Sequence, residues 1–201
     1  MTHLSLTKMA IALGVTLGAT GSSLAAAIDF ESTPTGVYSS LTYGAATITF
    51  TAGTGQFNVD DQTPGPPISG HNIISFFQNP GAGHFKTTIA GGANSFKIGV
   101  GDFDADEDHA HLRAFDSSGN LLDSADYINP AATFGGDYLS VASATPIAYV
   151  EFWEDGAFAG AVYWDNISYE VSAVPEPETY ALMALGLAAT GFAARRRRAV
   201  K

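Results

Sequence analysis

The chain has 201 residues, of which 20 are acidic and 9 are basic, and its formal net charge at pH 7 is −11. It contains no cysteine, which excludes disulfides as a source of stability. So acidic a chain repels nucleic-acid phosphates, and we therefore exclude nucleic-acid binding. The stability of the fold must therefore come from packing and hydrogen bonds, and a bound metal ion is a further candidate source.

The first 27 residues are typical of a secretory signal peptide. Lys8 precedes an apolar stretch at residues 9–17, and small residues follow up to Ala25-Ala26-Ala27. A charged segment, a hydrophobic segment and a small-residue site, in that order, are what signal peptidase recognises. We predict a signal helix within residues 1–27 and a mature chain that begins at Ile28. A buried core helix is the alternative.

Residues 28–173 predict one all-β domain. Apolar and polar residues alternate over short runs, turn-forming residues separate the runs, and no long 3.6-residue period appears. Phe96, Ile98 and Val100 share one face of a strand whose other face carries Ser95 and Lys97. Strands this short and regularly spaced favour two packed sheets, a β-sandwich of jelly-roll type. The expected strands are Ile28–Glu31, Ala45–Thr51, Gln56–Val59, Asn72–Phe77, His84–Ile89, Asn94–Val100, Ala110–Phe115, Leu121–Ala125, Tyr138–Ala142, Ile147–Trp153 and Ala161–Val171.

This domain is more acidic than the whole chain. Its basic residues are Lys86, Lys97 and Arg113, against 18 acidic residues, so its net charge is −15. Divalent cations, neutral glycans and basic partners are compatible with such a surface, and solubility alone also explains it.

A first candidate calcium site joins the two ends of the domain. Asp29 and Glu31 are expected on one face of the first strand, and Asp165 and Asn166 interrupt the last strand. If these strands are neighbours, the four residues form a cage of the oxygen ligands that calcium prefers. The alternative is that they hydrogen-bond the strand ends, with a β-bulge at Asp165–Asn166.

A second candidate calcium site is the run Asp102, Asp104, Asp106 and Asp108, whose Asp-x-Asp-x-Asp spacing opens like a calcium loop. It departs from the EF-hand pattern, because Glu107 replaces the glycine at the sixth position and Arg113 stands at the twelfth. We therefore reject an EF-hand and keep a looser calcium loop. A solvated acidic hairpin tip is the alternative.

His109 and His111 follow this run. Residues two apart on a strand point to the same side, so the pair is able to chelate zinc or copper once a third ligand joins. Asp108 and Asp116 are the suppliers that the sequence suggests. An ordinary surface pair is the alternative.

Aromatic rings are the usual platforms for sugars, and Tyr127, Tyr138 and Trp153 are the candidate ligand-binding residues. Most aromatic residues of a sandwich belong to its core, which is our expectation for Phe96, Phe152 and Trp164.

Residues 174–201 combine three segments. Val174-Pro175-Glu176-Pro177 stays extended, because proline fixes φ and disfavours helix at the residue before it. An uncharged apolar run of 15 residues follows from Tyr180 to Ala194, and Arg195, Arg196, Arg197 and Arg198 then hold the end in the cytoplasm. We predict a short transmembrane helix. At about 1.5 Å per residue the run spans roughly 22 Å, less than the ~30 Å hydrocarbon core.

This arrangement closely resembles the PEP-CTERM sorting signal of Gram-negative bacteria that produce exopolysaccharide. The resemblance implies that exosortase, a membrane protease-transpeptidase, recognises the tail and cleaves near the Pro-Glu-Pro motif. It also implies an exported protein, first an inner-membrane-anchored precursor and then a protein of the cell surface or extracellular matrix. A bitopic protein with its bulk outside is the alternative.

Two stretches of the domain, 101–122 and 161–169, resemble secreted PEP-CTERM proteins and, more loosely, carbohydrate-binding-module jelly rolls that hold a structural calcium. We predict a non-catalytic envelope or biofilm-matrix protein that binds exopolysaccharide or acts structurally, with calcium as its cofactor. The alternative is a glycosidase or lyase on the same scaffold. Carboxylate pairs such as Glu151 with Glu154 or Asp155 occur, but the sequence has no nucleophile elbow, zinc-protease helix or phosphate loop.

Overall fold

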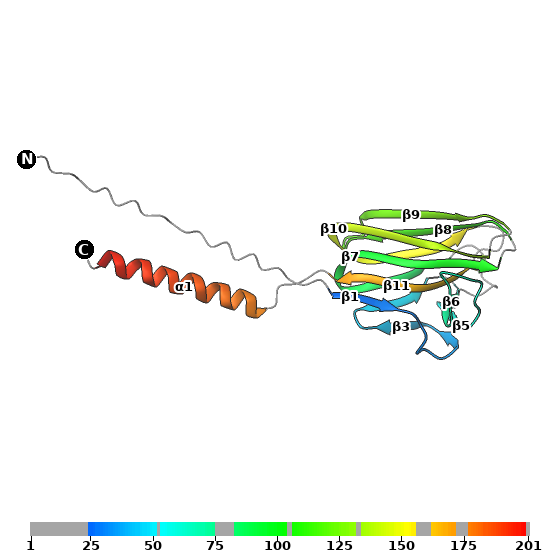
Figure 1. The fold of residues 1–201 in the computed structure, drawn as a ribbon, viewed down its shortest axis with the longest axis horizontal. Helices are drawn as coiled ribbons and strands as arrows, with labels where there is room; N and C mark the ends of the chain where they lie inside the picture. The colour runs from blue at the N-terminus through cyan, green and yellow to red at the C-terminus, as the bar shows by residue number, and fades with distance from the viewer. Residues whose placement is uncertain are drawn as a thin grey trace, which may run out of the picture. The chain divides into compact units, whose positions relative to one another are not determined.

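The computed structural model describes residues 24–51, 53–74, 83–103, 106–131, 134–155, 162–171 and 177–199 (Figure 1). The chain divides into a β domain at residues 23–174 and a second unit that contains the helix α1, Pro177–Ala199. The predicted signal peptide lies almost wholly outside the described residues. The strands are β1 (Leu24–Ile28), β2 (Gly36–Tyr38), β3 (Ser40–Tyr43), β4 (Ala46–Phe50), β5 (Phe57–Asp60), β6 (Asn72–Ile74), β7 (Phe85–Phe103), β8 (Asp108–Phe115), β9 (Leu121–Asn129), β10 (Phe134–Asp155) and β11 (Tyr163–Val171).

Two long strands, β7 and β10, arrange the sheet in two layers. Layer 1 has the order β3, β4, first part of β7, second part of β10, β8 and β9. Layer 2 has the order β2, β5, β6, β11, second part of β7 and first part of β10, and β1 also pairs with β11. All of these pairs are antiparallel, and hydrogen bonds connect the described strands into one sheet. The predicted all-β class is confirmed, whereas the jelly-roll type stays a prediction.

The change of layer occurs at a bend in each long strand. Gly91 and Gly92 have φ of 82° and 77°, values that glycine adopts without strain. In β10 the pairing register shifts between Ala142 and Ile147. The strands predicted at His84–Ile89 and Asn94–Val100 are therefore one continuous strand with a bend where the sequence predicts a turn.

Large apolar side chains fill the space between the layers. The rings of Phe152 in layer 1 and Trp164 in layer 2 lie 4.9 Å apart, and those of Phe85 and Phe57 lie 5.4 Å apart. Phe96 is also buried, so the prediction that Phe96, Phe152 and Trp164 belong to the core is confirmed. Burial of each such side chain contributes about 1.5–3 kcal/mol to stability.

The first predicted strand is displaced. β1 spans Leu24–Ile28, and Phe30 has φ of 57°, which ends the extended conformation. The prediction that Asp29 and Glu31 share a face of this strand is therefore wrong. Four of the five residues of β1 also precede the predicted mature start at Ile28, which stays a prediction.

The helix α1 begins at Pro177, a residue type that suits the first turn of a helix because its missing N–H needs no partner there. No helix in the described part of the chain combines the length and the apolar character required to cross a membrane. The transmembrane helix stays a prediction.

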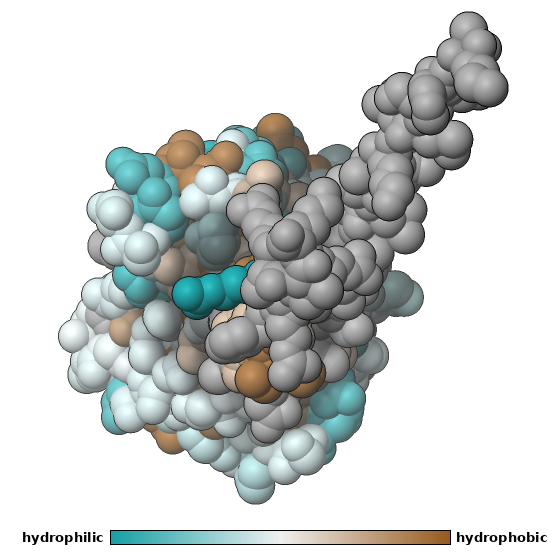
Figure 2. Space-filling view, turned by 90° about the vertical axis from the view of Figure 1, so that its left-hand side faces the viewer, coloured by the Kyte–Doolittle hydropathy of each residue, from teal (hydrophilic) through white to brown (hydrophobic). Residues whose placement is uncertain are grey.

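The visible surface of the chain carries residues of intermediate and hydrophilic character with hydrophobic ones scattered among them (Figure 2). Large exposed apolar side chains of the β domain include Val37 of β2, Leu121 and Ile128 at opposite ends of β9, and Phe134 of β10. Isolated apolar residues of this kind are normal on a protein surface.

Candidate functional site

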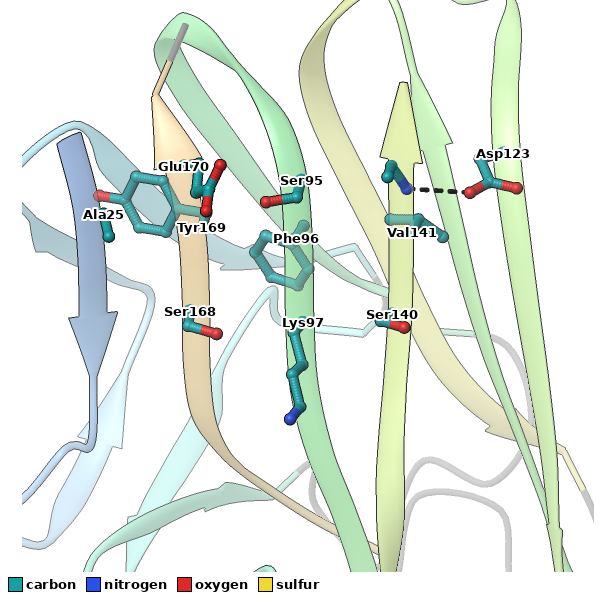
Figure 3. A pocket seen from close by; sticks show the side chains of 11 residues that line it. Ala25, Ser95, Phe96, Lys97, Asp123, Ser140, Val141, Ser168, Tyr169 and Glu170 are labelled. Carbon is teal, nitrogen blue, oxygen red and sulfur yellow. Dashed lines mark hydrogen bonds between the residues drawn. The ribbon is translucent and has the colours of Figure 1, made fainter. Parts of the chain in front are cut away.

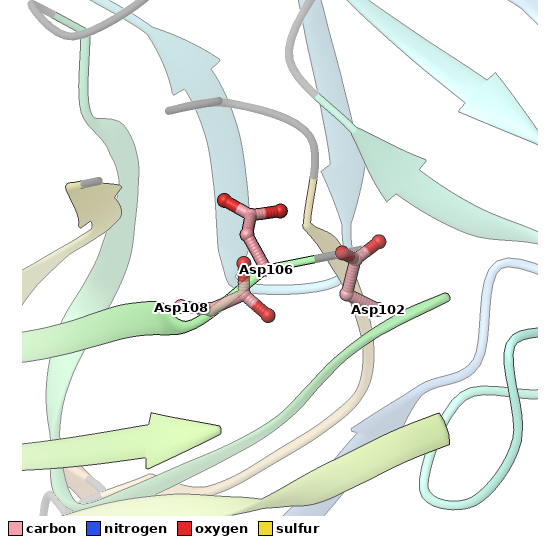
Figure 4. A group of neighbouring side chains, drawn as sticks. All are labelled: Asp102, Asp106 and Asp108. Atoms are coloured by element: carbon pink, nitrogen blue, oxygen red, sulfur yellow. The ribbon is translucent and has the colours of Figure 1, made fainter. Parts of the chain in front are cut away.

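Three aspartates gather where β7 ends and β8 begins (Figure 4). Asp102, Asp106 and Asp108 each offer a carboxylate oxygen, and these oxygens all lie within 4.8 Å of one another. Asp102 and Asp108 are 6% and 4% exposed, and Asp106 is half-buried. Asp104, the fourth predicted ligand, lies outside the described residues. We refer to Asp102, Asp106 and Asp108 as the acid cluster.

The electrostatics of the acid cluster favour a bound cation. Burial and, to a smaller extent, the nearby charge of Asp102 raise the pKa of Asp108 to about 6, although a hydrogen bond from Asn129 Nδ2 opposes both effects. Oδ2 of Asp106 is buried and has no hydrogen-bond partner among the described residues. A hard cation would neutralise the charges and satisfy this oxygen, so the donors present fit calcium.

The neighbouring strands hold the cluster in place. In the pairing register Asp102 lies opposite Gly135 of β10, and Asp108 lies opposite Asn129 of β9. The Asn129 side chain also donates to the carbonyl of Gly135 at 3.3 Å, so it links both sides of the cluster.

The other predicted cage is arranged differently. Asp165 is fully buried, and its carboxylate accepts hydrogen bonds from Ser69 N at 3.1 Å and Asn166 N at 2.6 Å. Glu31 instead accepts from the backbone of His71, and Asp29 accepts from the backbone of Glu31. Among the described residues, the acid cluster is the group of three carboxylates close enough to share an ion.

The alternative bulge at Asp165–Asn166 is confirmed. The pairing of β11 with β7 shifts register between Asp165 and Ser168, and Asn166 has φ of 51°. Burial, with a smaller contribution from the charges of Glu31 and Asp29, raises the pKa of Asp165 to about 7, although the hydrogen bonds from Ser69 and Asn166 oppose this rise.

The three predicted sugar platforms lie on different faces of the domain. Tyr127 packs against the core from β9, and its hydroxyl donates to Asn129 at 3.2 Å. Tyr138 is 41% exposed on the outer face of layer 2. Trp153 lies on the outer face of layer 1 between two imidazoles: His84 stacks on it at 4.0 Å and His111 at 4.9 Å. The three residues therefore do not form one site.

A groove of about 590 Å³ lies on the outer face of layer 2 (Figure 3). Two cross-strand rows run along it: Ala27, Ser168, Lys97 and Ser140 form one, and Ala25, Glu170, Ser95 and Ala142 form the other. Six of these eight side chains are alanine or serine, the exceptions being Lys97 and Glu170, and small side chains on four adjacent strands leave a hollow in the sheet surface. We call this feature the serine groove.

Charged groups stand within and beside the serine groove. Lys97 occupies the middle of its row, and its Nζ lies 3.8 Å from the centre of the Tyr138 ring, a cation–π contact. Asp123 at the rim accepts a hydrogen bond from Ala142 N at 2.9 Å. Ser95, Ser140 and Ser168 are not predicted as a group from the sequence. The sequence indicates only that each serine alternates with buried apolar residues along its strand and therefore faces outward.

The C-terminal segment is similar to a known family of sorting signals. Its proline-flanked glutamate, apolar run and arginine cluster are all present. Residues 173–198 match the PEP-CTERM protein-sorting motif. This sorting motif indicates an exported, exosortase-processed protein of the cell surface, as the sequence analysis predicts from the same residues. A search of curated proteins finds no match.

Several solved structures are similar to the β domain. The tailspike protein 4 enzymatic domain of bacteriophage CBA120 is 16% identical over 63% of this chain, with a TM-score of 0.40, and this chain spans about a fifth (19%) of it. The K3 adhesin domain of Porphyromonas gingivalis Lys-gingipain is 16% identical over 75% of this chain and 100% of its own, with a TM-score of 0.43. A family 29 carbohydrate-binding module is 11% identical over 75% of this chain and 87% of its own, with a TM-score of 0.37. Similarity this low transfers neither ligand nor activity to this chain.

Proposed function

We propose that this protein is an exported, exosortase-processed component of the envelope or biofilm matrix, whose β domain binds exopolysaccharide without catalysing a reaction. The observation that carries the proposal is the serine groove. Its hydroxyls are donors and acceptors that match the hydroxyl groups of a sugar, and the Tyr138 ring at its side offers an apolar face. A groove of this size accommodates a short saccharide segment.

The sorting motif supports the route that we propose for export. Signal peptidase removes the N-terminal segment, the apolar run holds the precursor in the inner membrane, and the four arginines keep its end cytoplasmic. Exosortase then cleaves near the Pro-Glu-Pro motif. The short apolar run suits a temporary anchor, because a span below the membrane thickness is a weak permanent one.

Substitution of Lys97 should weaken polysaccharide binding. We expect Lys97→Ala to lower the affinity for the organism's own exopolysaccharide about tenfold, because a charged hydrogen-bond donor contributes on the order of 1.5 kcal/mol. Lys86→Ala is a matched control, since Lys86 also lies over a tyrosine ring, at 3.6 Å from Tyr149, but on the outer face of layer 1. Affinity electrophoresis measures both. Equal retention of the two variants would contradict binding in the serine groove.

We also propose that calcium binds the acid cluster and stabilises the domain. Calcium at 100 times its Kd would add about 2.7 kcal/mol, or roughly 5–10 °C in Tm for a domain of this size. The measurement is a melting curve with excess calcium and with chelator. Asp106→Asn should remove the increase, and Asp29→Asn should keep it. Identical curves with and without calcium would contradict both predicted calcium sites.

The enzyme alternative has its own test. A glycosidase or lyase on this scaffold would release reducing ends or unsaturated products from the organism's polysaccharide, and we expect neither with the purified chain.

A further inference from the structure

The outer face of layer 1 gathers histidines and carboxylates from neighbouring strands. In the pairing register Asp155 of β10 lies opposite His109 of β8, and Trp153 lies opposite His111. Asp126 of β9 lies opposite His111 on the far side. These side chains project outward from three adjacent strands. We call the set His109, His111, Asp126 and Asp155 the histidine face.

The two imidazoles approach the same carboxylate. Nε2 of His111 lies 3.2 Å from Oδ2 of Asp155, and Nδ1 of His109 lies 3.8 Å from Oδ1 of Asp155. Nε2 of His111 is buried, and despite this proximity it makes no hydrogen bond with any described residue. Two ligands of a tetrahedral zinc ion at 2.0–2.1 Å are separated by about 3.3 Å, so the 3.2 Å spacing suits a shared metal.

The second nitrogen of each ring is held by another carboxylate. Nδ1 of His111 contacts Oδ1 of Asp126 at 2.6 Å, and Nε2 of His109 contacts Oε1 of Glu107 at 2.9 Å. A carboxylate only accepts, so each ring donates there and, when neutral, directs its lone pair from the other nitrogen toward Asp155. Histidines that bind metals commonly donate their second N–H to a carboxylate in this way. Arg113 Nη2 contacts the same Oδ1 of Asp126 at 2.7 Å and so helps to hold this carboxylate in place.

We propose that Nδ1 of His109, Nε2 of His111 and the carboxylate of Asp155 bind a divalent transition-metal ion of the zinc type, with a fourth position open to water. Imidazole with one carboxylate is a donor set for zinc or copper, whereas the all-oxygen acid cluster suits calcium. The metal draws His109 toward the other two ligands, and its side chain, which is 42% exposed, has room to turn. The sequence suggests Asp108 or Asp116 as the third ligand, but neither belongs to this proposed site. Asp108 is part of the acid cluster, and Asp116 accepts a hydrogen bond from Asn120.

The competing arrangement is a network of ion pairs in which both histidines are protonated and donate to Asp155. Zinc titration of the purified, metal-stripped full chain distinguishes the two. Calorimetry with ZnCl2 in millimolar calcium, added to compete with zinc at the acid cluster, should show one zinc site. His111→Ala and Asp155→Asn should each lower the zinc affinity at least 100-fold. Asp126→Asn should lower it 10–100-fold, because it removes only the orienting hydrogen bond.

His84→Ala is the matched control. His84 stacks on the other side of Trp153 and pairs with Glu151, so its loss should change the zinc affinity less than threefold. NMR spectra of the unsubstituted chain give a second readout: zinc should shift the ring signals of His109 and His111 and leave those of His84 in place. Zinc affinity that survives His111→Ala, or that is lost in Asp106→Asn, would overturn the proposal.

Discussion

The folded chain should be more stable at pH 5 than at pH 8. Two buried carboxylates have raised pKa values, about 7 for Asp165 and about 6 for Asp108, against 3.8 for an ordinary aspartate. The native state therefore binds more protons than the unfolded state between about pH 4 and pH 7, and stability falls as pH rises through this window. Between pH 5 and pH 8 the two groups together account for a loss on the order of 4 kcal/mol.

Among the described residues, the other groups whose pKa is shifted do not reverse this fall in stability between pH 5 and pH 8. The hydrogen bond to Glu107 raises the pKa of His109, which also favours the folded state at lower pH. Hydrogen bonds lower the pKa of Asp116, through Asn120, and of Asp126, through His111. Stability from these two groups is lost only below about pH 4, outside the window compared.

Urea unfolding in chelator at pH 5 and pH 8 measures the effect. Asp165→Asn should remove the larger part of the difference, since an amide stays neutral at both values. Asp123→Asn is a control of equal charge change at a carboxylate that is not deeply buried. Equal stability of the parent chain at both pH values would show that Asp165 and Asp108 are ionised in the fold.

Calcium should reduce this pH dependence in part. An ion at the acid cluster requires the charged form of Asp108 and opposes its protonation. Excess calcium should therefore remove the contribution of Asp108 to the pH dependence of stability. The contribution of Asp165 should remain, because Asp165 lies outside the acid cluster. Comparison of Asp165→Asn with and without calcium separates the two contributions.

The sequence predicts local features of the fold better than features that join distant segments. Alternation along single strands correctly places Phe96, Ile98 and Val100 in the core. The pair Gly91-Gly92 is predicted to form a turn between two strands, but it forms a bend within β7. The sequence does not distinguish the two, because glycine at positive φ suits both a tight turn and a bend within a strand. β2 and β3 are missed because neither strand has a buried residue, whereas the equally short β5 and β6 have buried residues and are predicted.

The candidate sites follow the same rule. The acid cluster is predictable because its members lie within seven residues of one another. The cage of Asp29 with Asp165 depends on an extended backbone through Phe30, which has positive φ instead. To predict the serine groove, one must know the pairing registers of four strands. To predict Asp155 as a ligand of the histidine face, one must know that β8 pairs with β10. The alternation of apolar and polar residues specifies neither.

Gly136→Ala should be among the most damaging substitutions in the β domain. A Cβ at this position would lie 1.9 Å from the carbonyl oxygen of Val100 and 2.8 Å from Cα of Gly101. Both atoms belong to the backbone of β7, so relief requires the two central strands of layer 2 to separate. We expect a loss of about 3 kcal/mol or more, the upper part of the range for overpacking. Unfolding in urea, followed by tryptophan fluorescence of buried Trp164, measures it.

The same strain should reach the acid cluster, because Gly135, next to Gly136, pairs with Asp102 and its carbonyl accepts the Asn129 side chain. Gly136→Ala should therefore lose the calcium-dependent rise in Tm as well as overall stability. Gly186→Ala makes the identical chemical change in α1, where the added methyl group meets nothing within 4 Å, and should leave both quantities unchanged. A Gly136→Ala chain within 1 kcal/mol of the parent would mean that β7 and β10 do not approach this closely, and the geometry of the acid cluster that depends on their contact would fail with it.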